Sequence, residues 1–134
     1  MVRTFTTYQG QLHCEIQHEP SGKKLETDAP VDNNGKGESF SPTDLVGAAL
    51  GSCILTTIAM VAERDGERIE NAKATVEKHM TDKPRKIGEL RLTITMPKSL
   101  SPQHRKKYEE VAHHCPVHRS LDPAMKIPMT FIYE

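Results

Sequence analysis

The first third of the chain alternates apolar and polar residues with a period of two, the pattern of a half-buried strand. Three positions share the apolar side of this pattern: Leu12, Cys14 and Ile16. Residues 19–22 are typical of a turn, and residues 24–27 are long enough for a short returning strand. Residues 32–37 are all turn formers or lysine and predict a flexible loop. The chain therefore begins with β-structure.

The stretch Leu45–Ala62 contains no charged residue and predicts a long helix. Ser41 is suited to cap this helix, and Pro42 fits its first position. Asp44 stands at the third position, where an acid can hydrogen-bond back to the cap backbone. Asp65-Gly66 supplies the stop signal.

The long helix lies at the lower length limit for a transmembrane span, but glycine, serine and threonine interrupt it and strand patterns flank it. We therefore predict a buried helix and no membrane association. A helix that is apolar on all sides must be covered on all sides. Only 36% of the chain is apolar, with three Tyr, three Phe and no Trp. We expect a homodimer in which a second copy supplies the missing cover.

The second half of the chain predicts a hairpin, a helix and a closing strand. Residues 72–80 and 90–96 alternate as two strands around a turn at 82–85. Ser101-Pro102 begins a helix by the same cap-plus-proline device, and Pro116 ends it. Apolar residues recur at helical spacing in it: Tyr108, Val111, Ala112 and Cys115. With a strand at residues 127–133, this order predicts one α+β domain over residues 1–134, with antiparallel sheets packed against two main helices.

Charge and cysteine content narrow the possible functions. The chain has 18 basic and 18 acidic residues without a basic stripe, which argues against nucleic-acid binding. No charged leader precedes an apolar core at the N-terminus, so we expect a cytoplasmic protein. Three cysteines are too few for a secreted disulfide scaffold, and in a reducing compartment they are more often catalytic, redox-sensing or buried.

Cys53 and Cys115 stand in different predicted environments, as a two-cysteine redox site requires. Cys53 lies well inside the long helix among small residues. The alternative interpretation is that Cys53 is a small core residue in a tight helix crossing, without a redox role. Cys115 lies at the C-terminal end of the second helix, where partial negative charge disfavours a thiolate. This predicts that Cys115 resolves rather than attacks. Cys14 is most simply core filling in a strand.

Three histidines surround Cys115: His113, His114 and His118. Cys115 and His118 have ligand-like spacing, but a metal site would also need Cys53 or His79 to converge there. The sequence has no second paired motif, so we predict neither a metal nor another cofactor. A solvated helix end, where cations are favourable, is the alternative explanation for the histidines.

Two segments together resemble a known family. The segment Ser41-Pro42-Thr43-Asp44-Leu45 through Gly51-Ser52-Cys53, followed far downstream by Cys115-Pro116-Val117, is similar to the OsmC/Ohr family of osmotically inducible and organic hydroperoxide resistance proteins. The predicted order of strands and helices also fits. The resemblance implies an OsmC-like fold, an intertwined homodimer and active sites at the subunit interface.

The resemblance also implies an activity, a thiol-dependent peroxidase that acts on organic hydroperoxides in the oxidative stress response. By position, Cys53 is the peroxidatic cysteine, and Cys115 resolves its sulfenic acid to a disulfide that an external dithiol reduces. This is peroxiredoxin-type chemistry without a prosthetic group. It makes Cys53 and Cys115 the candidate catalytic residues.

The residues that activate the cysteine in the family are not matched. Members with established peroxidase chemistry carry a Glu ten residues before the peroxidatic cysteine, where this chain has Thr43 followed by Asp44. Thr43 and Asp44 are therefore the candidates for activation or positioning. The family also uses an N-terminal Arg, and this chain has none between Arg3 and Arg64. These departures keep open an alternative, a non-catalytic or redox-sensing OsmC-like protein that binds a small ligand.

Overall fold

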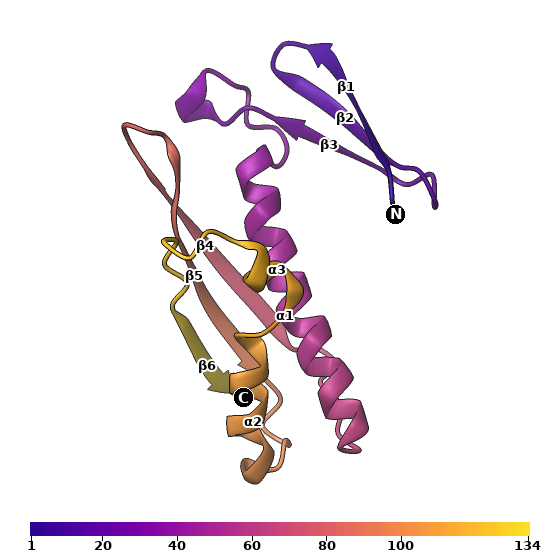
Figure 1. Cartoon of the computed structure of the whole chain (residues 1–134), viewed down its shortest axis with the longest axis vertical. Helices are drawn as coiled ribbons and strands as arrows, with labels where there is room; N and C mark the ends of the chain where they lie inside the picture. The colour runs from indigo at the N-terminus through magenta and orange to yellow at the C-terminus, as the bar shows by residue number, and fades with distance from the viewer. The chain divides into compact units, whose positions relative to one another are not determined.

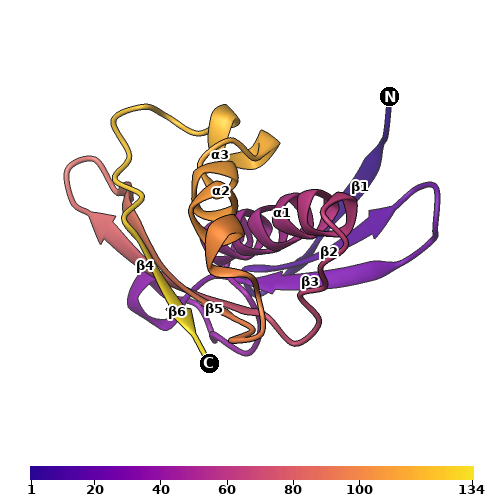
Figure 2. The same cartoon turned by 90° about the horizontal axis from the view of Figure 1, so that it is seen from below.

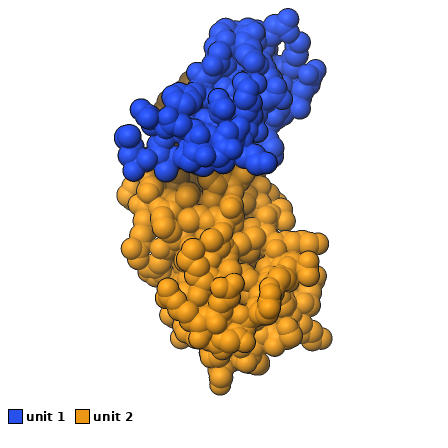
Figure 3. All heavy atoms as spheres, turned by 90° about the vertical axis from the view of Figure 1, so that its right-hand side faces the viewer, with its two compact units in different colours: residues 1–46 blue, residues 47–134 orange.

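The computed structural model describes all residues, 1–134, in two compact units that comprise residues 1–46 and 47–134 (Figure 3). Strands and helices are mixed along the chain, which confirms the predicted α+β class. The single domain predicted over residues 1–134 stays a prediction.

The first unit is built around a three-stranded antiparallel sheet in the order β1-β2-β3. Its strands are β1 (Thr4–Gly10), β2 (His13–His18) and β3 (Lys24–Asp28), and the short 3-10 helix η1 (Val31–Asn33) lies in the predicted loop. Only Thr27 and Asp28 are buried among the strand residues, whereas several large apolar side chains are exposed. This sheet therefore has no apolar core of its own.

Helix α1 (Pro42–Arg64) begins with the predicted capping box. The backbone N–H of Ser41 donates to Asp44 Oδ2 at 2.9 Å, and the backbone N–H of Asp44 donates to Ser41 Oγ at 3.1 Å. Two donors at the start of the helix are thus satisfied reciprocally. The helix ends at Arg64, and Gly66 follows with a φ of +75°, a conformation that glycine adopts without strain.

The second unit contains the sheet β4-β5-β6, with α1, α2 and α3 on the same side of it (Figures 1 and 2). The predicted hairpin is confirmed as β4 (Lys73–Thr81) and β5 (Lys86–Met96), and β6 spans Met129–Tyr133. Unlike the hairpin pair, β6 runs parallel to β5. Parallel neighbours need a crossover, which α2 (Pro102–Ala112) and α3 (Pro116–Ser120) provide.

Within the second unit, one face of α1 packs on the hairpin. A Cβ added at Gly51 would lie 3.2 Å from Val76 Cγ2, and one added at Gly47 would lie 3.4 Å from Val76 Cγ1. The absence of side chains at Gly47 and Gly51 lets the helix approach β4 closely. The core combines one row from α1 with one from β5: Leu50, Ile54, Ile58, Ala62, Leu90, Leu92, Ile94 and Met96.

The opposite face of α1 is exposed within the chain. Helix α1 is long and apolar enough to cross a membrane by length and composition alone, and 33% of its apolar 18-residue window is buried. Its inward face packs as in the core helix of a folded domain. The outward positions are small or apolar: Ala48, Ala49, Ser52, Thr56 and Met60. Within one chain the predicted burial of α1 is confirmed for one face, and cover of the other face by a second copy stays a prediction.

A polar anchor fixes α2 near the end of α1. The fully buried Tyr108 places its hydroxyl 3.2 Å from Asp65 Oδ2 and 3.3 Å from Glu67 Oε2. The Glu67 carboxylate also accepts hydrogen bonds from the backbone N–H of Ser101 at 3.2 Å and from His104 Nδ1 at 2.9 Å. Ser101 occupies the predicted N-cap position, but its side chain makes no capping hydrogen bond. The backbone N–H of Ser101 instead donates to the Glu67 carboxylate of this anchor.

We expect Gly51→Leu to lower the free energy of unfolding by about 1–3 kcal/mol, because a larger side chain overpacks the contact with Val76. Urea denaturation followed by circular dichroism measures the change. Glu63→Leu, which introduces the same side chain at an exposed position of α1, is the matched control and should change stability by less. Equal stability of both variants would contradict the close helix–hairpin contact.

Candidate redox site

Two free thiols lie near each other in the second unit. Cys53 projects from α1, and Cys115 lies between α2 and α3. Cys53 lies close enough to Cys115 to raise the pKa of the Cys115 thiol. The structure therefore brings together the two cysteines predicted as a pair, although they are far apart in the sequence. Cys14 belongs to β2 of the first unit, is half-buried and pairs across the sheet with Tyr8 and Thr27.

Cys115 is fully buried and holds its sulfur against the start of α3. It is the N-cap residue of α3, and its Sγ accepts a hydrogen bond from the backbone N–H of His118 at 3.3 Å. Burial, as the largest effect, raises the pKa of the Cys115 thiol above its ordinary value of 9.0, and the nearby Cys53 raises it further. Backbone N–H groups of His118 and Val117 act in the opposite direction. Burial wins, so Cys115 is a neutral thiol at neutral pH.

The predicted placement of Cys115 at a helix C-terminus is wrong. Helix α2 ends at Ala112, and Pro116 begins α3 rather than ending α2. The disfavoured thiolate at Cys115 therefore results from burial, not from the negative end of a helix. The sequence does carry the missed signal, because proline is common at the first position of a helix and Pro116 directly follows Cys115.

Cys53 is the more accessible of the two thiols. It is only partly buried, whereas Cys115 has no exposed surface. Its backbone carbonyl accepts a hydrogen bond from Thr57 Oγ1 at 2.8 Å, and so the residue remains a regular part of α1. A small molecule that reaches this pair from solvent therefore meets Cys53 first.

Thr43 and Asp44 contribute to the N-terminus of α1. Thr43 Oγ1 lies 3.2 Å from Ser41 Oγ, and the Asp44 carboxylate accepts the Ser41 N–H. The capping box accounts for the presence of an acid at position 44. A role for either residue in activating or positioning the thiol stays a prediction.

The histidines near Cys115 form a pair of rings and not a chelating group. The ring centroids of His113 and His118 lie 5.9 Å apart, edge to face. Burial lowers the pKa of His118 from its ordinary value, and His113 lowers it further, so His118 is neutral at neutral pH. Nδ1 of His114 lies 2.8 Å from the carbonyl oxygen of Glu110. In residues 1–134, no three His, Cys, Asp or Glu side chains converge in a way that could hold a metal ion.

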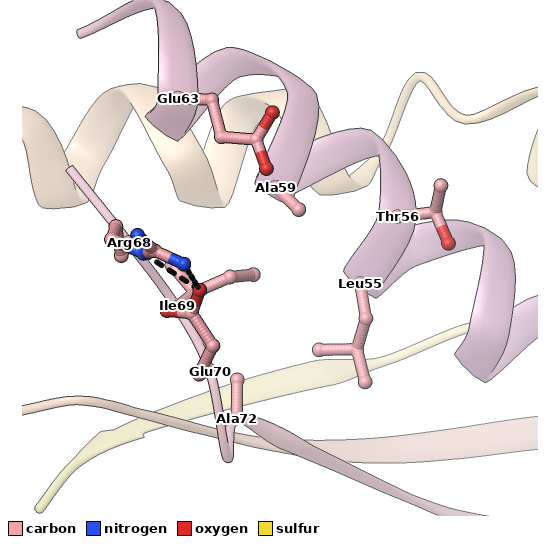
Figure 4. A pocket seen from close by; sticks show the side chains of 8 residues that line it. All are labelled: Leu55, Thr56, Ala59, Glu63, Arg68, Ile69, Glu70 and Ala72. Carbon is pink, nitrogen blue, oxygen red and sulfur yellow. Dashed lines mark hydrogen bonds and ion pairs between the residues drawn. The ribbon is translucent and has the colours of Figure 1, made fainter. Parts of the chain in front are cut away.

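A separate pocket of about 330 Å³ lies between α1 and the segment that leads into β4 (Figure 4). Leu55, Ala59 and Ala72 give it an apolar wall, and Arg68 pairs with Glu70 at its rim with Nε 2.7 Å from Oε1. Neither Cys53 nor Cys115 lines this pocket. It is therefore distinct from the dithiol pair.

The fold and its paired thiols define a small α+β dithiol protein. The chain belongs to the family of OsmC-like proteins, whose sequence pattern matches residues 35–130. The predicted family and fold are thus confirmed. No curated protein matches the chain.

Solved structures show the same fold over nearly the whole chain. A protein from Psychrobacter arcticus 273-4, provisionally named an osmotic stress induced and detoxification response protein, is 39% identical, with 100% of this chain and 96% of that chain covered and a TM-score of 0.90. OsmC from Legionella pneumophila, an organic hydroperoxide resistance protein, is 18% identical, with 98% and 96% covered and a TM-score of 0.76. An organic hydroperoxide resistance protein from Elizabethkingia anophelis with bound thiocyanate is 14% identical, with 100% and 96% covered and a TM-score of 0.80.

We expect iodoacetamide to modify Cys53 before Cys115 in the reduced native protein. Cys115 is buried and its pKa is raised, so its alkylation at neutral pH should be slow and should keep increasing as the pH rises above 9.0. Peptide mass spectrometry over a pH series measures both sites. Cys115 reacting at neutral pH as fast as in the unfolded chain would contradict the assigned environment.

Proposed function

We propose that this protein is a cysteine-based peroxidase that reduces organic hydroperoxides in the cytoplasm. The observation that carries the proposal is the pairing of a partly exposed Cys53 with a buried, protonated Cys115 whose pKa Cys53 raises. Membership of the OsmC family and the names of two structural neighbours point to the same chemistry.

The first step takes place at Cys53. Its thiolate attacks the distal oxygen of the hydroperoxide, the O–O bond breaks, and the alkoxide leaves as an alcohol after taking up a proton. The sulfur is thereby oxidised to a sulfenic acid. The neutral Cys115 thiol can donate a hydrogen bond to the Cys53 thiolate and so stabilise the attacking form. Small neighbours in α1, such as Ala49 and Ser52, leave room for an alkyl substrate.

The second step joins the two sulfurs. The Cys115 sulfur attacks the Cys53 sulfenic acid, the S–O bond breaks, and hydroxide leaves with the Cys115 proton as water. An external dithiol then supplies two electrons and two protons to regenerate both thiols. No prosthetic group takes part in this cycle.

We further propose that the protein acts as a homodimer with the second copy covering surfaces that the chain leaves exposed. The outward face of α1 carries small or apolar residues, and Met60 on it is 56% exposed. The sheet β1-β2-β3 lacks an apolar core and exposes Phe5 and Tyr8. Two such surfaces on one small chain are typical of an intertwined assembly.

Binding without turnover is the second candidate. The observation that favours it is Thr43, a neutral residue at the position where peroxidase members of the family carry a Glu. In this case the dithiol senses or tethers a small apolar or thiol-containing ligand. Slow, near-stoichiometric oxidation together with ligand binding by Cys53→Ser would favour this candidate.

The peroxidase proposal predicts fast oxidation of reduced protein by cumene hydroperoxide and slower oxidation by hydrogen peroxide in anaerobic stopped-flow experiments. We expect Cys53→Ser to lower the rate by at least about 100-fold because it removes the nucleophile. Cys115→Ser should retain the first step but accumulate a sulfenic acid. Cys14→Ser is the matched control and should react like the unchanged protein. Oxidation of the unchanged protein no faster than that of a free thiol would refute the proposal.

The homodimer proposal predicts a molar mass of twice 15.0 kDa by light scattering after gel filtration. Met60→Lys places a charge on the outward face of α1 and should shift the protein toward the monomer, because burying an unpaired charge is costly. Gln103→Lys, at an exposed position of α2, is the control and should leave the mass unchanged. A monomeric unchanged protein would contradict the proposal.

A further inference from the structure

The two sulfurs of the candidate site differ in their access to solvent. Cys115 has 0% exposed surface in the single chain, whereas Cys53 is partly exposed. Association with a second copy can only reduce exposure further, so Cys115 stays buried in any assembly of this fold. A reductant that approaches a Cys53–Cys115 disulfide from solvent therefore reaches the Cys53 sulfur before the other.

The surroundings of Cys115 also suit its sulfur to act as the leaving group when the disulfide is reduced. The backbone N–H of His118 donates to Cys115 Sγ at 3.3 Å, and both this N–H and that of Val117 lower the pKa of the thiol. These donors stabilise negative charge on Sγ while the S–S bond breaks. Burial then favours the neutral form, so the sulfur takes up a proton and returns to the resting thiol.

We propose that re-reduction is regiospecific, with the incoming thiolate attacking Cys53 Sγ and Cys115 serving as the leaving group. This inference rests on the disulfide of the proposed function. The new sulfur–sulfur bond forms at Cys53, the Cys53–Cys115 bond breaks, and its electron pair goes to Cys115 Sγ, which is protonated from solvent. A second reductant thiolate then attacks the reductant sulfur of the mixed disulfide, and Cys53 leaves as a thiolate.

Geometry strengthens the distinction between the two sulfurs. In thiol–disulfide exchange the attacking, central and leaving sulfurs lie nearly in a line, and the rate depends on which sulfur is accessible. Attack at Cys53 can start from the solvent, because this residue is partly exposed. Attack at Cys115 would require the reductant to enter the interior behind the start of α3, where Cys115 is covered completely.

The test uses the full-length protein oxidised with diamide, so that it does not depend on reaction with a peroxide. Glutathione is added, the reaction is stopped with acid at early times, and peptide mass spectrometry locates the glutathione adduct. We expect the adduct on Cys53 to exceed that on Cys115 by about tenfold or more in the native protein. The same disulfide in concentrated guanidinium chloride is the matched control and should give adducts on both cysteines.

Adducts of similar amount on both cysteines, or mainly on Cys115, in the native protein would overturn the inference but leave the peroxidase proposal intact. Failure of diamide to form a Cys53–Cys115 disulfide would overturn both the inference and the assignment of Cys115 as resolving cysteine. Repetition with Cys14→Ser should give the same Cys53 preference. A preference that disappears in this variant would show exchange through Cys14 and would also overturn the inference.

Discussion

The close packing of α1 against the β4–β5 hairpin is the constraint on which the dithiol pair depends. Gly47 and Gly51 let the helix approach Val76, and the buried row of α1 then interlocks with the inward residues of β5. This contact fixes the rotation of the helix and with it the direction in which Cys53 projects. The Tyr108 anchor holds α2 near the end of α1, and the chain that leaves α2 brings Cys115 to Cys53.

Opposing effects on the pKa of Cys115 determine the different roles of the two cysteines. Backbone N–H groups at the start of α3 favour a thiolate, whereas burial and the neighbouring Cys53 disfavour it, and burial is the largest effect. The result is one protonated interior thiol beside one partly exposed thiol. This difference in access and protonation suits sequential attack and resolution better than two equivalent cysteines would.

Local signals in the sequence predicted much of this arrangement. Ser41 and Asp44 form the expected capping box, and the alternating residues of the hairpin lie where expected. The parallel pairing of β6 and the Tyr108 anchor depend on contacts between distant residues, which periodicity does not encode. Helix α3 is not among the predicted elements because Pro116 is also typical of a helix stop, although proline is equally suited to a helix start.

The two residues of the candidate site were predictable from the sequence, but their burial and hydrogen bonds were not. Residue types and the family resemblance single out Cys53 and Cys115, and the fold brings them together. The buried state of Cys115 and its hydrogen bond from His118 follow from tertiary packing and were not predictable. Cover of the outward face of α1 by a second copy stays a prediction, and within one chain this face is exposed.

Cys53 and Cys115 are proposed to act as one redox unit. Intact-protein mass spectrometry of fully reduced protein after addition of one equivalent of cumene hydroperoxide tests it most directly. The chain should lose two hydrogen atoms, gain no oxygen and yield a Cys53–Cys115 linked peptide. A stable gain of oxygen at Cys53, or an unchanged mass, would contradict it.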